Sequence, residues 1–160
     1  MSLNKKIHFI HANGFPPNAY KSFFGNLSSN LKIVNFNLIN LKYLKITDWF
    51  PLHTDFLNSL DTNKNITAIG HSIGGNIILR SAISNPNYFS KIILLDPTLF
   101  IPRIIWLWKI ALYLNIHNML HPWVKATLKR KMYYKDYNTM YKSYRNKEVF
   151  NKIDDKNLSI

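Results

Sequence analysis

The chain has 160 residues, of which 47% are hydrophobic and 18% charged, enough apolar material to bury a core, and this excludes an intrinsically disordered protein. It contains no cysteine, which excludes disulfides, thiolate metal sites and a cysteine nucleophile. The formal net charge is +13, but no nucleic-acid-binding motif accompanies it, so we expect no nucleic-acid partner.

The sequence shows no targeting or membrane-spanning segment. The first residues do not have the pattern of a secretory signal, and no apolar run reaches the roughly 20 residues needed to cross a bilayer. Neither metal-ligand spacing nor a nucleotide-binding loop is present. We therefore expect a cytoplasmic protein without a cofactor or metal.

Four apolar runs, none of them alternating in polarity, predict buried strands. The first begins at Lys5 and ends in a turn that contains Gly14. The others cover Leu31–Ile39, Asn65–Gly70 and Lys91–Asp96. Strands without alternation are typical of a parallel sheet that is covered on both faces.

Helical spacing of apolar residues fills the gaps between these runs. The first helical face contains Tyr20, Phe23, Phe24, Leu27 and Leu31. The second contains Trp49, Leu52, Phe56 and Leu60, with Asp48 as the expected N-cap. A third helix follows the third strand over 72–84 and ends at Asn85-Pro86.

This order predicts an α/β fold: a parallel sheet of about four strands, with helices on both faces. The composition changes after Pro97, and from Arg103 onward the chain is aromatic, basic and helix-like with no strand signal. We expect residues 1–100 to form the α/β core and 101–160 a helical segment.

The stretch "NITAIGHSIGG" carries the main chemical signal. Gly70, Ser72 and Gly74 form G-x-S-x-G where a strand passes into a helix, a turn so sharp that only small neighbours fit beside the serine. The hydroxyl of such a serine projects above the sheet, and the amide of Ile73 at the helix start can stabilise an oxyanion. The alternative is an ordinary turn with an N-capping serine.

The loop after the first strand, "HANGFPP", faces the same edge of the sheet. Gly14 permits a close approach of backbone, and the amides of Asn13 and Phe15 are both possible oxyanion donors. We interpret His11 as a buried residue that braces this loop rather than as a catalytic base.

In this order, "HANGFPPNAY", "IGHSIGG" and "LLDPTLF" resemble the α/β-hydrolase superfamily over residues 5 to about 100, and the helical segment is similar to its cap. The resemblance implies a serine hydrolase acting on a small ester or related acyl bond. Ser72 would be the nucleophile and His71 the usual residue before it. Ile73 and the loop from His11 to Phe15 would form the oxyanion hole.

The same resemblance raises a difficulty, because the superfamily places its acid and histidine on strands that follow the cap. The chain reaches Ile160 before such strands appear, so we expect a truncated hydrolase whose uncovered sheet edge favours self-association. Asp96, at the end of the fourth strand, is the candidate acid, against the alternative of an Asp-Pro turn. His117 and His121 are the only histidines after Ser72, and their cap-like context does not favour either as the base.

The alternative function is a non-catalytic remnant or binding module. In that interpretation, the basic aromatic segment contacts an anionic membrane or a protein partner. The residues that suggest it are Arg103, Trp106, Trp108, Lys109 and Trp123.

Overall fold

The computed structural model describes residues 5–27, 31–38, 49–61, 64–116, 131 and 133–158. The chain divides into two compact units, Met1–Leu99 and Phe100–Ile160, and each is described by itself. The expected cap at Asp48 lies outside the described residues.

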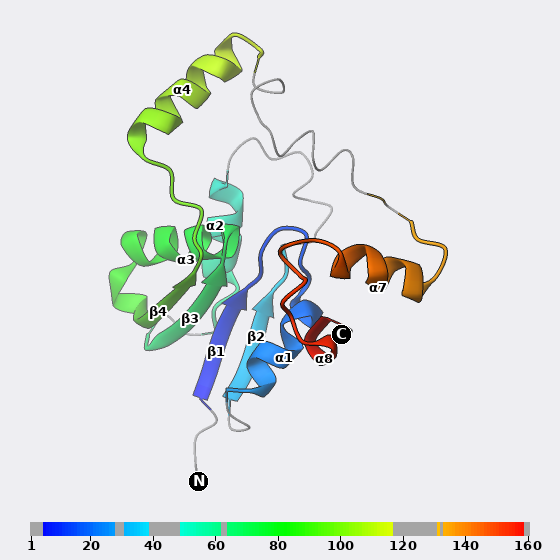
Figure 1. Ribbon diagram of the computed structural model, residues 1–160. Coiled ribbons are helices and arrows are strands. Elements are labelled where there is room, and N and C mark those ends of the chain that lie inside the picture. Colours follow the sequence, from blue (N-terminus) through cyan, green and yellow to red (C-terminus); the bar gives the residue numbers. More distant parts are fainter. Residues whose placement is uncertain are drawn as a thin grey trace. The chain divides into compact units, whose positions relative to one another are not determined.

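The first unit contains a four-stranded sheet in the order β2-β1-β3-β4 (Figure 1). Its strands are β1 (Lys5–Ile10), β2 (Leu31–Phe36), β3 (Ile66–His71) and β4 (Phe89–Leu95). All three neighbouring pairs are parallel, which confirms the expected parallel sheet. Their carboxyl ends therefore lie at one edge, where the loops after β1, β3 and β4 gather.

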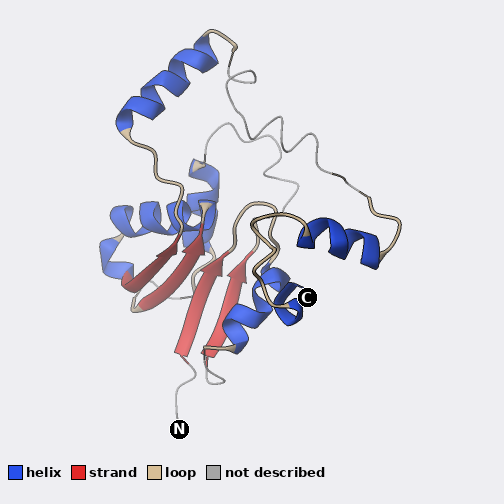
Figure 2. Cartoon of the chain, viewed as in Figure 1, coloured by secondary structure: helices blue, strands red, loops and turns tan. Residues whose placement is uncertain are grey.

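Helices cover both faces of this sheet, as expected (Figure 2). On one face, α2 (Phe50–Asn58) and α3 (Ile73–Ser84) pack against a buried core. On the other face are the 3-10 helix η1 (Pro17–Tyr20) and α1 (Lys21–Gly25). A second 3-10 helix, η3 (Pro86–Tyr88), directly precedes β4. The first core contains Ile10, Leu52, Phe56, Ile66, Ala68, Ile77 and Ile78, and the second contains Ile7, Phe9 and Ile69, with Tyr20 and Phe24 packed against it.

The first helix is shorter than its spacing predicts. It ends at Gly25, so Leu27 lies beyond it and is exposed, while Leu31 is already the first residue of β2. The interpretation of both leucines as part of one helical face is therefore wrong. The reason is topological: the chain has to turn back after α1 to run β2 parallel to β1.

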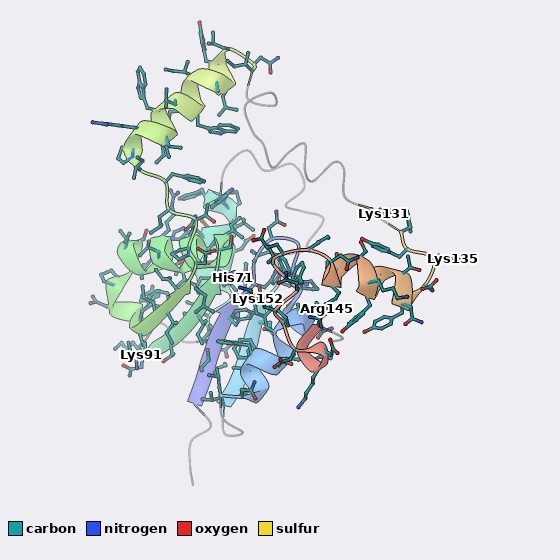
Figure 3. The ribbon with its side chains drawn as sticks, in the orientation of Figure 1. His71, Lys91, Lys131, Lys135, Arg145 and Lys152 are labelled. Atoms are coloured by element: carbon teal, nitrogen blue, oxygen red, sulfur yellow. The ribbon has the colours of Figure 1, made fainter. Side chains whose placement is uncertain are left out.

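The second unit contains α4 (Pro102–Tyr113), α7 (Tyr137–Arg145) and the short α8 (Asp155–Leu158), and no strand among its described residues. On α7, the Arg145 guanidinium (Figure 3) donates to the backbone oxygens of Phe150 and Ile153 and to the Asp155 carboxylate. These bonds tie α7 to the segment that leads into α8. No described helix combines the length and the apolar character needed to span a membrane.

Candidate active site

Ser72 is the single residue between the end of β3 and the start of α3. Its backbone has φ 53° and ψ −118°, a conformation that residues other than glycine rarely adopt. Two backbone hydrogen bonds hold it: the Ser72 amide donates to Leu95 O at the end of β4 (3.0 Å), and its carbonyl accepts from the Asn76 amide (3.3 Å). The strained residue is thus fixed from both the neighbouring strand and the helix.

The glycines on either side have no room for a side chain. A Cβ at Gly70 would lie 2.4 Å from the backbone oxygen of Gly74, and a Cβ at Gly74 would lie 2.2 Å from that of Ile10. The turn after β3 therefore packs backbone against backbone, both within itself and against β1. The geometry is that of a sharp strand-to-helix elbow.

The Ser72 hydroxyl has one hydrogen-bond partner among the described residues. Its oxygen lies 3.1 Å from Oγ1 of Thr98, in the loop after β4. Asn76 of α3 donates to the carbonyl of Thr98 at 2.6 Å, which fixes that loop over the elbow. Sequence analysis missed Thr98, although its place just after the strand beside β3 was a usable signal.

In the loop after β1, the amides of Asn13 and Phe15 differ in their hydrogen bonding. The Phe15 amide donates to Ala12 O (3.2 Å), within the turn that contains Gly14 at φ 79°. The Asn13 amide makes no hydrogen bond to any described residue. Ile73 is the first residue of α3, where backbone amides lack intrahelical partners. Among the described residues of these turns, the amides of Asn13 and Ile73 are thus free to donate to a new acceptor atom.

His11 is fully buried and connects two loops. Its Nδ1 donates to Ala12 O (2.8 Å), and its Nε2 accepts the Leu38 amide (2.9 Å), just beyond β2. The same Nε2 atom of His11 also lies 3.1 Å from Oδ1 of Asn37. No hydrogen bond joins His11 to Ser72.

His71 is the last residue of β3 (Figure 3), and its ring forms no hydrogen bond with Ser72. Its Nδ1 lies 2.8 Å from the hydroxyl of Tyr20, which also accepts the Ala12 amide at 3.0 Å. Sequence analysis did not single out Tyr20 as a site residue.

The expected acid is placed at the same edge but makes no catalytic contact. Asp96 follows β4 with φ 43°, is exposed, and forms no hydrogen bond or ion pair within the described part of the chain. It is not joined to Ser72 or to a histidine.

The described histidines supply no base to Ser72. His8 and His53 are buried, and burial lowers the pKa of each below the ordinary value. His117 and His121 lie outside the described residues. The described residues also hold no cluster of His, Asp or Glu that could bind a metal.

Two solved structures share this architecture. MenH from S. aureus matches with a TM-score of 0.54 and 20% identity, over 82% of this chain and 57% of that chain. The peroxisomal α/β-hydrolase Lpx1 (Yor084w) from Saccharomyces cerevisiae matches with a TM-score of 0.53 and 17% identity, over 96% of this chain and 48% of that chain. The chain has the α/β-hydrolase fold.

The expected fold class is thereby confirmed, and the chain spans about half the length of each of these α/β-hydrolase structures. No protein-family model and no curated protein matches the sequence. The similarity establishes the fold, and the chemistry of the elbow is a separate question.

Proposed function

We propose that Ser72 is the nucleophile of a serine hydrolase that acts on an ester or related acyl bond. The observation that carries this proposal is the strained backbone of Ser72 between two glycines that cannot accept a Cβ. Strain of about 1–3 kcal/mol persists only where the surroundings enforce it, and it gathers at functional sites. An ordinary N-capping serine would need no such backbone, and Ser72 makes no side-chain cap.

In this proposal, the Ser72 oxygen attacks the acyl carbon as its proton passes to a general base, and the amides of Ile73 and Asn13 hold the negative oxygen that develops. Breaking the acyl–oxygen bond of the ester then releases the alcohol, which takes up that proton, and water hydrolyses the acyl-enzyme. Asn13 is preferred to Phe15 because the Phe15 amide already donates to Ala12 O. Each donor at such a site is worth about 3–4 kcal/mol to the transition state.

The general base is proposed to come from outside the described residues. Asp96 stays a candidate for orienting it, since the carboxylate lies at the carboxyl end of the neighbouring strand and has no competing partner among the described residues. Without a base, the oxyanion hole and substrate binding alone retain only about 10³–10⁴-fold catalysis over water.

A fluorophosphonate probe tests the nucleophile. We expect the chain to be labelled, the Ser72→Ala variant not to be labelled, and Ser84→Ala to label like the wild type. Ser84 is a matched control because it is an exposed serine at the other end of α3. A folded wild-type chain that takes up no probe would refute an activated nucleophile.

Added imidazole tests whether the base is missing. If Ser72 lacks one, imidazole in solution will accelerate hydrolysis of a p-nitrophenyl ester by the wild-type chain beyond its effect on Ser72→Ala. Equal acceleration of the two would show that no Ser72-dependent reaction awaits a base.

A second candidate function, contact with an anionic membrane, is favoured by α4. Its exposed side chains include Ile104, Trp106 and Leu107, with Arg103 and Lys109 and no acidic residue. Such a composition suits a helix lying in a membrane interface. Co-sedimentation with phosphatidylserine vesicles at low salt, reduced by Trp106→Ser, would support it; the absence of binding at low salt would exclude it.

A further inference from the structure

The Tyr20 hydroxyl lies between the two turns that carry the candidate oxyanion amides. It accepts the backbone N–H of Ala12 (3.0 Å) and lies 2.8 Å from Nδ1 of His71. Its oxygen accepts from Ala12, and its own proton is free to be donated to Nδ1 of His71. The hydroxyl therefore joins a backbone group after β1 to a side chain at the end of β3.

Both partners lie close in sequence to the proposed oxyanion donors. Ala12 immediately precedes Asn13, and His71 lies two residues before Ile73, with Ser72 between them. A peptide unit is planar and its neighbours are only about 3.8 Å apart, so fixing one residue restricts the amide that follows. The Tyr20 hydroxyl therefore bonds to residues that lie one and two positions before the proposed donors.

The surroundings hold Tyr20 and Ala12 in place. The Tyr20 ring packs edge-to-face on Phe9 (centroids 4.7 Å apart) and on His71 (5.8 Å). The carbonyl of Ala12 accepts from His11 Nδ1 and from the Phe15 amide, so both of its polar backbone groups are satisfied. Burial raises the pKa of Tyr20 above its ordinary value, so the hydroxyl keeps its proton at neutral pH.

We propose that Tyr20 is a positioning residue, whose hydroxyl ties the loop after β1 to the elbow after β3 and sets the spacing of the Asn13 and Ile73 amides. This inference rests on the proposed function of Ser72. Tyr20 touches neither the substrate nor the reacting atoms; it acts through Ala12 and His71.

The test compares Tyr20→Phe, which removes only the hydroxyl, with Tyr88→Phe. Tyr88 is also a half-buried tyrosine of the first unit, and its hydroxyl has no hydrogen-bond partner among the described residues. We expect the rate constant of fluorophosphonate labelling to fall at least about tenfold in Tyr20→Phe, because small misplacements of reacting groups have large kinetic effects. The labelling rate constant of Tyr88→Phe should stay within about twofold of wild type, because the Tyr88 hydroxyl positions no reacting group. Labelling of Tyr20→Phe at the wild-type rate would overturn the proposal.

Nitrogen-15 NMR gives a readout that does not depend on labelling. In the wild type, the nitrogen-15 shift of His71 Nδ1 should show its hydrogen bond to Tyr20, and the Ala12 amide should exchange slowly with solvent. Both signatures should be lost in Tyr20→Phe and kept in Tyr88→Phe. If the wild type takes up no probe, the proposed nucleophile fails. The two NMR signatures then test by themselves whether the Tyr20 hydroxyl ties Ala12 to His71, and their persistence in Tyr20→Phe would refute that connection.

A second variant covers the case in which Tyr20→Phe fails to fold. His71→Leu removes the other end of the same connection and should reproduce the loss of labelling. If both variants fold, the double variant should label no more slowly than the slower single one, since the two side chains act as one unit. Multiplying losses would show that Tyr20 and His71 act independently and would contradict the proposal.

Discussion

The backbone of Ser72 concentrates the strain of the elbow in one residue. With φ 53° and ψ −118°, it lies in a region that glycine enters freely and other residues enter at a cost of about 1–3 kcal/mol. We therefore expect Ser72→Gly to be more stable than Ser72→Ala by about 1 kcal/mol in urea unfolding. Neither variant should take up the probe. Equal stability of the two variants would mean that the backbone strain is no larger than the unfolded-state entropy that glycine adds.

Gly74 makes the closest backbone approach in the first unit's elbow. A Cβ there would lie 2.2 Å from the Ile10 carbonyl oxygen, and backbone on both sides leaves no flexible group to move aside. We expect Gly74→Ala to lower the free energy of unfolding by about 3 kcal/mol or more. Gly25→Ala is the matched control, since a Cβ at Gly25 meets nothing within 4 Å. A loss similar to that of Gly25→Ala would contradict the packing of the elbow against β1.

At this scale, the sequence reveals the backbone requirement but not the side-chain contacts. The two glycines around Ser72 can be recognised from their spacing, because the steric need is local. The Ser72–Thr98 contact joins residues 26 apart, and the Tyr20–His71 contact joins residues 51 apart. Such pairs depend on strand order and register, which no local pattern fixes.

Among the elements, the strands were more predictable than the helices. All four apolar runs became strands, with ends displaced by one to three residues. The signal fits best for β3, which is buried along almost its whole length, whereas β2 and β4 at the sheet edges are only partly buried. The helix after β1 was overextended through Leu27 and Leu31, since apolar spacing persisted past the point where the chain turns back. Periodicity marks which residues are apolar, and tertiary topology decides where the helix ends.

The N-cap of α7 gives a prediction for the second unit. The Asp136 carboxylate accepts the Thr139 amide at 2.7 Å, and this bond lowers the pKa of Asp136. A lowered pKa means that the cap stabilises α7 above the ordinary pKa of aspartate and is lost as the pH falls through the lowered value. We expect Asp136→Ala to speed amide exchange at Thr139, whereas Asp136→Asn should retain much of the protection. Unchanged exchange in Asp136→Ala would show that the cap does not hold the helix start.

For the whole molecule, the described sheet accounts for the fold and for part of the site that we propose. The chain spans about half the length of the two solved structures it matches, and it brings the elbow at Ser72, the loop after β1 and Thr98 to one sheet edge. These features come from loops after β1, β3 and β4, so one parallel sheet suffices to assemble them. A general base would have to approach the same edge.

Acid stability is also a property of the whole first unit. Burial lowers the pKa of His8 and His53; Lys6 adds to the effect at His8, and Arg80 of α3 adds to it at His53. Both ring nitrogens of His53 are buried without a hydrogen-bond partner in the described structure. Both histidines are therefore held neutral in the folded state, whereas in the unfolded chain they take up protons near their ordinary pKa of 6.5.

The sign of the pH effect follows from this difference in bound protons. Below pH 6.5, the unfolded chain binds more protons than the folded one. The free energy of unfolding therefore decreases as the pH is lowered, until the lowered pKa of the folded state is reached. Each such histidine adds a slope of up to about 1.4 kcal/mol per pH unit. We expect the free energy of urea unfolding to fall between pH 7 and pH 5, and His53→Leu to flatten that fall. Ser84→Ala should keep the wild-type slope, and a His53→Leu variant as acid-sensitive as the wild type would show that His53 is not held neutral by the fold.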